Sequence, residues 1–236
     1  SEIFNKFPMK IHIDSLITGA SRAKGAVVII DVFRAFTTAA LAFSRGAKKI
    51  YLVPDVIRAK ALKDMGLADY CVGEVDGKKP LDFDIGNSPY EITKLNLKNK
   101  TLILSTRAGV VGVDSVETAD VIMGASLVNA FATCKWLVNN QFQEITIVAM
   151  GWAGKIRSDE DELCAMYMRN ILENRKTDHN SIKNIILASP HAAKFDDVNQ
   201  PWYHYQDRDL ALNIDSIDCP IVITSENGIL VAIQGD

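Results

Sequence analysis

VVIIDVFRAFTT, residues 27–38, is the stretch that decides how this chain folds. Four apolar residues lead directly into Asp31, and Arg34, Thr37 and Thr38 follow within two helical turns. The pattern predicts a buried strand ending in a carboxylate, then a helix whose first turns can bind an anion. Ligands of open α/β sheets bind beyond the carboxyl ends of the strands, so Asp31 and Arg34 are candidate catalytic residues, with Thr37 beside them. The alternative is that Asp31 only caps the helix and Arg34 pairs with it.

Strand-like and helix-like segments alternate on both sides of this stretch. The expected strands are 9–13, 26–32, 48–53, 70–74, 101–106, 120–125 and 144–150, and the expected helices are 37–45, 55–65, a run ending near 117, 127–139 and 158–174. Continuous runs of Val, Ile and Leu are typical of strands buried on both faces. We therefore expect an α/β fold with three layers, α/β/α, around a largely parallel but mixed central sheet. Two more strands are expected at 184–188 and 229–234, within a single domain over residues 1–236.

Composition restricts the class of protein. The 236 residues are 48% hydrophobic with a net charge of −3 and no basic stripe, which argues against a nucleic-acid partner. No apolar run is long enough to span a bilayer, and SEIFNKFPMK lacks the apolar core of a secretory signal, so we expect no membrane partner and a cytoplasmic location. The four cysteines are far apart without a CxxC pair and are interpreted as small hydrophobic residues.

Residues 78–91, KKPLDFDIGNSPYE, interrupt the alternation and are expected to form a functional loop. Asp84, Asn87 and Ser88 bring a carboxylate, an amide and a hydroxyl close together, which suits a hard cation and an oxyanion. The same residue types are also ordinary turn formers. Glu74, just before this loop, is either a metal ligand or a solvated acid at a strand end.

Two further strand ends carry polar residues. In STRAGV, residues 105–110, we expect Thr106, Arg107 and Gly109 to contribute to an anion site. After the next strand, Ser126 and Asn129 repeat the arrangement, and Ser126 could instead be a helix N-cap.

Four acidic residues open the expected helix at 158–174. Ser158 and Asp161 have the spacing of a capping box, and acids in a first turn are favoured by the helix dipole. Glu160 and Asp161 remain candidate metal ligands. The four histidines show neither metal-ligand spacing nor a partner nucleophile, so a His-dependent triad is not expected.

The segments VVIIDVFRAFTT, VGEVDG, FDIGNSPYE, LILSTRAGV, IMGASLVNA and VAMGWAGKIRSDEDELCA occur in an order and spacing that resemble the 2-phosphosulfolactate phosphatase family. The resemblance runs nearly end to end, and DVFRAFTT and FDIGNSP are its most specific pieces. It implies an α/β fold and a magnesium-dependent removal of phosphate from 2-phosphosulfolactate, on the route to coenzyme M. The chain departs from the family at Phe33 and Phe36, and in STRAGV, where much of the family has a sequence like TTTNGT. These departures leave the substrate more open than the reaction.

We therefore predict a magnesium-dependent phosphoric monoester hydrolase that acts on 2-phosphosulfolactate or a related 2-phospho acid. Arg34 and Arg107 would stabilise the transferring phosphoryl group. The candidates for binding Mg²⁺ are Glu74, Asp84, Glu160 and Asp161, while Asp31 binds the metal or acts as nucleophile or base. Phe33 stands where a haloacid-dehalogenase-type phosphatase needs a second Asp, which counts against that mechanism. The alternative function is a non-catalytic relative that binds phosphate esters, and self-association into a homo-oligomer stays open.

Overall fold

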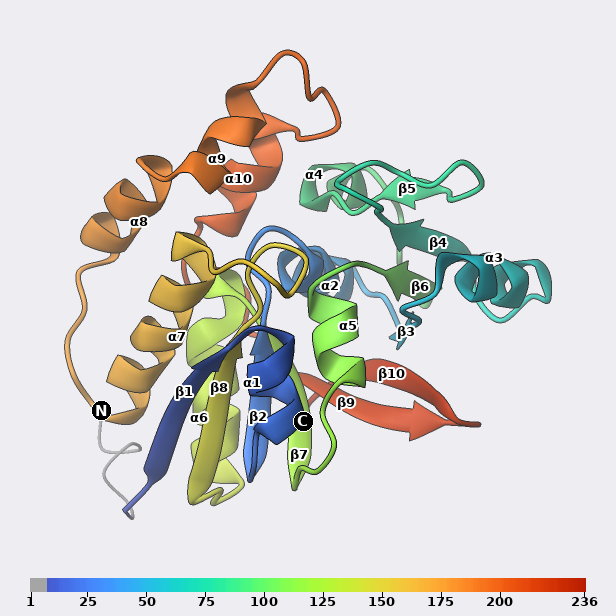
Figure 1. The fold of residues 1–236 in the computed structure, drawn as a ribbon. Coiled ribbons are helices and arrows are strands. Elements are labelled where there is room, and N and C mark those ends of the chain that lie inside the picture. Colours follow the sequence, from blue (N-terminus) through green and yellow to red (C-terminus); the bar gives the residue numbers. More distant parts are fainter. Residues whose placement is uncertain (1–7) are drawn as a thin grey trace.

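One sheet contains all the strands formed by residues 8–236, the part of the chain that the computed structural model describes (Figure 1). Residues 1–7 lie outside the described residues. They include most of the segment SEIFNKFPMK, from which we expected no secretory signal. The strands are β1 (Lys10–Ser15), β2 (Ala26–Ile30), β3 (Lys49–Leu52), β4 (Tyr70–Gly73), β5 (Ile85–Gly86), β6 (Thr101–Ser105), β7 (Val121–Ala125), β8 (Glu144–Ala149), β9 (Ile221–Glu226) and β10 (Ile229–Gln234).

Helices connect most of these strands. They are α1 (Leu16–Arg22), α2 (Ala35–Ser44), α3 (Val56–Asp64), α4 (Pro89–Thr93), α5 (Gly109–Asp114), α6 (Ala130–Asn139), α7 (Asp159–Leu172), α8 (His179–Leu187), α9 (Pro190–Ala193) and α10 (Tyr205–Ala211), with 3₁₀ turns η2 (Leu127–Asn129) and η3 (Lys194–Asp196). None of the helices within residues 8–236 is long and apolar enough to cross a membrane.

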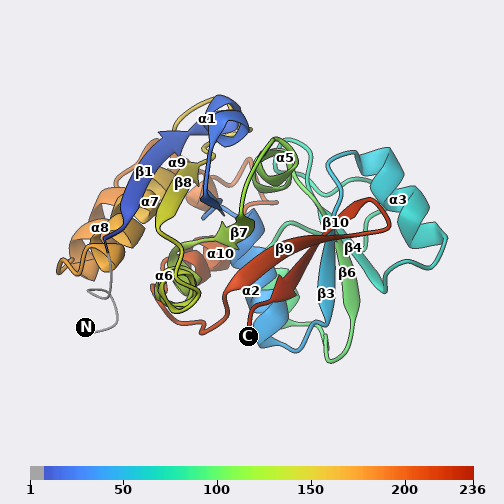
Figure 2. The same ribbon diagram turned by 90° about the horizontal axis from the view of Figure 1, so that it is seen from below.

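The sheet consists of two parallel blocks joined by an antiparallel hairpin. Its strand order is β1-β8-β2-β7-β9-β10-β3-β6-β4-β5. Neighbours are parallel from β1 to β7 and again from β3 to β5, and only the three pairings that involve β9 or β10 are antiparallel. Figure 2 shows β9 and β10, in red, between the two blocks. The expected α/β fold with a largely parallel, mixed sheet is confirmed.

The hairpin explains how the carboxyl ends of both blocks reach one place. Across three antiparallel pairings, β2 and β6 run in opposite local senses, yet the residues that follow them make contact. Five strand-to-strand steps, each twisting by about 20–25°, rotate β6 by roughly 100–125° relative to β2. The twist therefore turns the carboxyl edges of the two blocks toward each other, and the candidate residues at these edges meet.

Helices cover both faces of the sheet. Alternate residues of β2 face opposite ways: Val27 and Ile29 pack with α1, α2 and α5, whereas Val28 and Ile30 pack with α6, α7 and α8. A third cluster packs α3 against β3, β4 and β6. Burial on both faces is why β2 is apolar at every position. The four cysteines are buried in these cores.

Several parts of the fold differ from the sequence-based expectation. The helices α1, α9 and α10 were not predicted, and β5 and α4 form within residues 78–91, which were expected to be a loop. Residues 184–188 were predicted to form a strand, but they lie in and just after α8, where Ile182 and Ile186 are buried one turn apart and Asp178 caps the helix. The strand β9 was not predicted either. It pairs with β10 through Asn227 and Gly228, both at positive φ, as a two-residue hairpin turn requires.

Candidate active site

A pocket opens where the carboxyl ends of β2, β4, β6 and β8 meet. Its walls come from four regions: the residues after β2, the loop after β4, the start of the segment after β6, and the loop after β8. The segment between α9 and α10 forms the remaining wall. The lining residues are Asp31, Phe33, Arg34, Glu74, Asp76, Gly77, Asn87, Arg107, Ala108, Gly151, Trp152, Ala153, Lys194 and Tyr203.

Asp31 lies in the wall of this pocket, directly after β2, and is only 3% exposed. Its Oδ2 accepts a hydrogen bond from the backbone N–H of Gly109 at 2.9 Å. Burial raises the pKa of Asp31 to about 7, and the negative charges of Glu74 and Glu160 act in the same direction. Asp31 is thus a carboxylate held in an environment with too little positive charge to compensate it.

Glu160 and Asp161, in the first turn of α7, lie close enough to Asp31 to affect its charge and one another's. Both are buried, and Glu160 Oε2 has no hydrogen-bond partner among the described residues. Asp161 accepts from the backbone N–H of Val32 and of Gly151, at 2.8 Å each. Burial, and then the charges of Glu160 and Asp31, raise the pKa of Asp161.

The predicted capping box at Ser158 and Asp161 is wrong. Ser158 is the N-cap residue of α7, but its side chain makes no capping hydrogen bond, and its buried Oγ has no hydrogen-bond partner within residues 8–236. The Asp161 carboxylate instead ties α7 to the residues that follow β2 and β8. The position of Asp161 in the sequence is that of a helix-capping residue, but its carboxylate fixes two loops of the pocket.

Glu74 and Arg107 form the wall on the side of β4 and β6. Glu74 accepts from the backbone N–H of Gly77 and of Arg107, both at 2.8 Å. The Arg107 side chain lines the pocket and is exposed. Backbone N–H groups therefore fix Glu74, while the guanidinium of Arg107 is free to meet a ligand.

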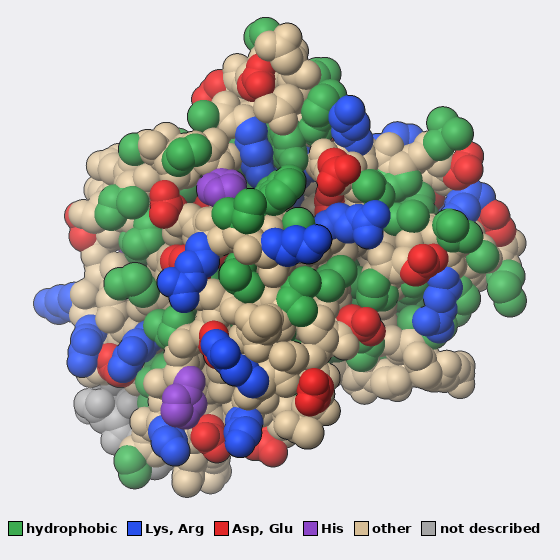
Figure 3. All heavy atoms as spheres, viewed as in Figure 1, with side chains coloured by type: hydrophobic (Ala, Val, Ile, Leu, Met, Phe, Trp, Pro, Cys, Tyr) green, Lys and Arg blue, Asp and Glu red, His purple; other side chains and the backbone are tan. Residues whose placement is uncertain are grey.

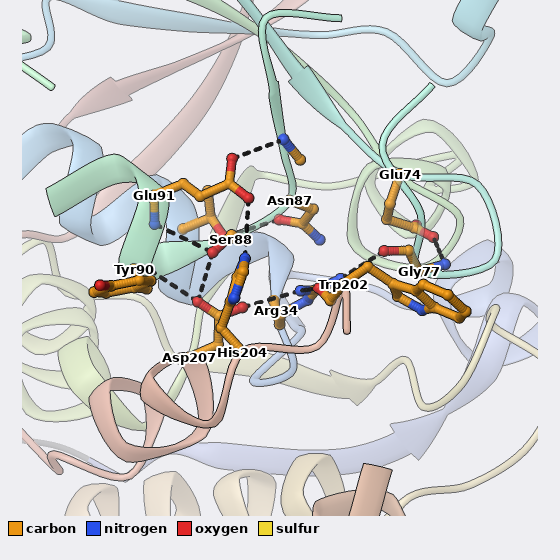
Figure 4. Close-up of polar contacts among 12 residues, drawn as sticks. Arg34, Glu74, Gly77, Asn87, Ser88, Tyr90, Glu91, Trp202, His204 and Asp207 are labelled. Carbon is orange, nitrogen blue, oxygen red and sulfur yellow. Dashed lines mark hydrogen bonds and ion pairs between the residues drawn. The ribbon is translucent and has the colours of Figure 1, made fainter. Parts of the chain in front are cut away.

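Arg34 also lines the pocket, but protein groups surround it. Its Nη1 donates to Asp207 Oδ2 and to the Trp202 carbonyl, and its Nη2 donates to the Gly77 carbonyl, at 3.0 Å each. Its guanidinium carbon lies 4.7 Å from the centroid of the Tyr203 ring. The alternative in which Arg34 pairs with Asp31 is wrong, because its ion pair is with Asp207 (Figure 4).

Asp207 joins three parts of the chain that are distant in sequence. It is fully buried in α10 and also accepts from Ser88 Oγ at 2.7 Å and from the Tyr90 N–H at 2.8 Å. Figure 4 shows these contacts converging on its carboxylate. The interaction links the segment after β2, the loop before α4 and the C-terminal segment. Sequence reasoning missed it, since Asp207 stands in no recognisable motif.

The C-terminal segment supplies two more pocket residues, Lys194 and Tyr203, that the sequence did not indicate. The Nζ of Lys194 lies 4.6 Å from the ring centroid of Tyr203, 5.4 Å from that of Phe195 and 6.0 Å from that of Phe33. Burial lowers the pKa of Lys194, and the charge of Arg34 adds to this effect, whereas the charge of Glu160 opposes it. The only available signal was the aromatic and polar composition of residues 191–207.

Several predicted site residues lie behind the pocket wall. Thr37 Oγ1 donates to the Val32 carbonyl at 2.7 Å and lies 3.0 Å from Ser126 Oγ, and Thr106 accepts from the Val110 N–H. Ser126 caps η2 in a capping box with Asn129, whose amide also donates to the Cys219 carbonyl. Ser88 caps α4. These side chains hold the strand ends and helix starts in place.

Two other loop residues have different locations. Asn87 lines the pocket, and its Oδ1 accepts from Thr38 Oγ1 at 2.8 Å. Asp84 does not line it: the carboxylate accepts from the Cys71 N–H and lies 3.8 Å from Lys63 Nζ. Of the four candidate metal ligands, Glu74 lines the pocket with Asp31. Glu160 and Asp161 do not line it, although the charge of Glu160 raises the pKa of Asp31 and the charge of Asp31 raises that of Asp161. Asp84 lies elsewhere.

Within residues 8–236, no group of three or more His, Cys, Asp or Glu side chains stands ready to surround a metal ion. The acids near Asp31 are close enough to influence one another's charge, but their oxygens do not converge on one point. Figure 3 shows Lys and Arg side chains interspersed with acidic ones on the face viewed in Figure 1, without one continuous basic surface.

The fold and the pocket define an α/β protein with a mixed acidic and basic ligand site at the carboxyl edge of its sheet. A family model described as 2-phosphosulpholactate phosphatase matches residues 11–208. The chain belongs to the 2-phosphosulfolactate phosphatase family.

Relatives support this membership, and each is named "Probable 2-phosphosulfolactate phosphatase". One from Bacillus subtilis (strain 168) is 38% identical over 186 residues, 76% of this chain and 78% of the relative. One from Parasynechococcus marenigrum (strain WH8102) is 30% identical over 187 residues, 78% and 74% of the two chains. One from Cyanothece sp. (strain PCC 7425 / ATCC 29141) is 36% identical over 140 residues, 58% and 57% of the two chains. The chain thus spans little more than half the length of the last relative.

Proposed function

We propose that this protein is a magnesium-dependent phosphatase that hydrolyses 2-phosphosulfolactate, or a related 2-phospho acid, to the 2-hydroxy acid and phosphate. The observation that carries the proposal is the buried, under-compensated carboxylate of Asp31 in a pocket that also presents Arg107 and Lys194. An ester dianion beside a second acid group needs several positive charges to bind, and its hydrolysis needs a nucleophile, a base or a metal ligand near phosphorus. Membership of the family supports the same reaction.

No three of the acids near Asp31 surround a single point within residues 8–236, but the chemical type of their donor atoms suits a hard divalent cation. Glu160 Oε2 is buried without a partner, and Asp31, Glu74 and Asp161 supply only oxygen atoms. Buried carboxylates without enough donors need a proton or a cation, and oxygen donors suit Mg²⁺. We expect Glu160 to hold it, with Glu74, Asp161 or Asp31 as the further candidate ligands. When bound, Mg²⁺ would supply positive charge to the transferring phosphoryl group.

The chain's own residues have separate tasks in this proposal. Arg107 presents a planar guanidinium that can bind two phosphoryl oxygens together. Asn87 offers its amide N–H groups from another part of the pocket lining. Gly109 fixes the orientation of Asp31 through its N–H. Arg34 adds positive charge in the pocket wall and holds the loop at Gly77 against the Trp202 segment.

Asp31 has two roles open to it, and one measurement separates them. As a metal ligand, it would lose affinity for Mg²⁺ when changed to Asn. As nucleophile or base, it would keep that affinity and lose turnover. Calorimetric titration of Asp31→Asn with Mg²⁺, beside the wild type, gives the answer.

The function itself is tested by phosphate release. The wild-type protein is assayed with 2-phosphosulfolactate, 2-phospholactate and 2-phosphoglycolate, each with Mg²⁺ and after exhaustive chelation. We expect release with Mg²⁺ and recovery when Mg²⁺ is restored to the chelated protein. Binding of these esters without any release would instead identify a non-catalytic relative, and release that is indifferent to chelation would remove magnesium from the proposal.

A further inference from the structure

Lys194 is a pocket cation whose charge no protein acid pairs with directly. It lines the pocket beside Asp31, and its ammonium lies over the rings of Tyr203, Phe195 and Phe33. Within residues 8–236, Lys194 Nζ makes neither a hydrogen bond nor a salt bridge. The aromatic faces therefore position the ammonium while leaving its three N–H donors unused.

The other two pocket cations differ from Lys194. Arg34 donates three hydrogen bonds to protein groups, so it contributes little directly to a ligand. Arg107 is exposed and carries a planar fork that matches a phosphoryl group. Lys194 is a compact point charge that is half-buried against aromatic rings, where an ion pair with a ligand is stronger than in bulk solvent. A singly charged carboxylate matches such a group.

We propose that Lys194 determines substrate specificity by binding the carboxylate attached to the ester-bearing carbon of a 2-phospho acid. The inference rests on the proposed phosphatase function and adds the part of the substrate that this residue recognises. It also explains the aromatic residue at position 33, since the Phe33 ring is one of the three rings that surround the Lys194 ammonium. The phosphoryl group is left to Arg107 and the acid cluster with its cation.

Two substrates that differ only in this carboxylate provide the test. Isopropyl phosphate is 2-phospholactate with a methyl group in place of the carboxylate. We compare kcat/KM of both substrates for the wild type, Lys194→Met and Lys194→Arg. Met keeps the length and the favourable contact with aromatic rings but removes the charge.

Lys194→Met should lose roughly 10- to 100-fold in kcat/KM for 2-phospholactate, mostly through KM, and less than about threefold for isopropyl phosphate. Lys194→Arg should recover part of the loss. Lys94→Met is the matched control, because Lys94 also lies over a ring, that of Tyr90, but does not line the pocket. Lys94→Met should leave kcat/KM unchanged for both substrates.

Equal losses for both substrates would overturn the inference and assign Lys194 to the phosphoryl group. No loss for either would overturn it as well. If the wild-type protein released phosphate from no 2-phospho acid, the proposed function would be contradicted instead. In that case Lys194 can still be tested by measuring calorimetrically how tightly the wild type, Lys194→Met and Lys194→Arg bind 2-phospholactate.

Discussion

Asp31 and Asp207 are both buried carboxylates in or near the pocket wall, but their surroundings are opposite. Asp207 receives an ion pair from Arg34 and hydrogen bonds from Ser88 and Tyr90. Asp31 receives the N–H of Gly109 and faces the charges of Glu74 and Glu160. A compensated carboxylate stabilises the fold, whereas an under-compensated one destabilises it unless a proton or ligand arrives. The contrast separates the scaffold of this site from its chemistry.

The largest effect is expected for Asp31→Asn. This nearly isosteric change removes the negative charge, so phosphate release should fall by about a thousandfold or more. The melting temperature should not fall, because Asn can still accept from Gly109 and no longer carries a buried charge. Steady-state kinetics and thermal unfolding of the same preparation check both statements. Near-normal activity would assign Asp31 to the scaffold.

Asp207→Asn should have the opposite signature. Removing one partner of a buried ion pair leaves Arg34 charged and uncompensated, which costs about 3–5 kcal/mol of folding stability. Urea unfolding at neutral pH measures this loss. Any protein that still folds should retain some turnover, because Asp207 does not line the pocket. A stability within error of the wild type would contradict the comparison.

The pH dependence of stability gives a third test. The pKa of Asp31 is about 7 in the folded protein, against an ordinary value of 3.8. Between these values the folded state holds the extra proton, so this group destabilises the metal-free protein progressively as the pH rises from about 4 to about 7. The destabilisation is complete above pH 7 and amounts to at most about 4 kcal/mol.

Asp31→Asn should therefore gain stability over the wild type as the pH rises, with little difference near pH 4. Denaturant unfolding in the presence of a chelator, at several pH values, measures the two curves. Asp161, whose pKa is also raised by burial, keeps part of the slope in the variant. Parallel curves for the two proteins would mean that Asp31 titrates normally.

The sequence predicted the regular parts of this molecule because local periodicity and burial determine them. Apart from the two-residue β5, the parallel strands were recognised from their apolar runs, and Asp31 was recognised from its place at a strand end. The helix at 179–187 was taken for a strand because NIILA is apolar without interruption, and its burial at Ile182 and Ile186 depends on tertiary packing. The Asn-Gly pair at 227–228 was a usable signal for the hairpin.

The missing parts of the site are those created by long-range contacts. Lys194 and Asp207 come from a segment with no βα rhythm, and no spacing in the sequence relates Asp207 to Arg34 or Lys194 to Phe33. Conversely, Thr37, Ser126 and Asn129 have suitable chemistry at suitable strand ends, yet their hydrogen bonds go to protein groups. Residue type and position alone do not distinguish these two outcomes.

Gly109→Ala tests how closely Asp31 must be held. A Cβ at this position would lie 2.9 Å from both Ala35 Cβ and Asp31 Oδ2, so one of them must move. We expect a loss of about 1–3 kcal/mol in stability and a lower kcat. Gly86→Ala is the control, since its Cβ would meet nothing closer than 3.7 Å and should stay within about 0.5 kcal/mol of the wild type. Equal behaviour of the two variants would contradict the tight fit around Asp31.

The smallest effect separates two serines that begin helical segments. Ser126 Oγ accepts from the Val128 N–H and belongs to a capping box, whereas the buried Oγ of Ser158 has no partner. Ser126→Ala should cost about 1 kcal/mol in stability and leave KM unchanged if its role is capping. Ser158→Ala removes no hydrogen bond within the protein and should be neutral or slightly stabilising. Unfolding curves and KM values for both variants measure these effects.

A raised KM in Ser126→Ala would show that Ser126 contributes to substrate binding. If Ser158→Ala instead lost activity at unchanged stability, its unpaired hydroxyl would belong, like Asp31, to the part of the pocket that awaits a ligand.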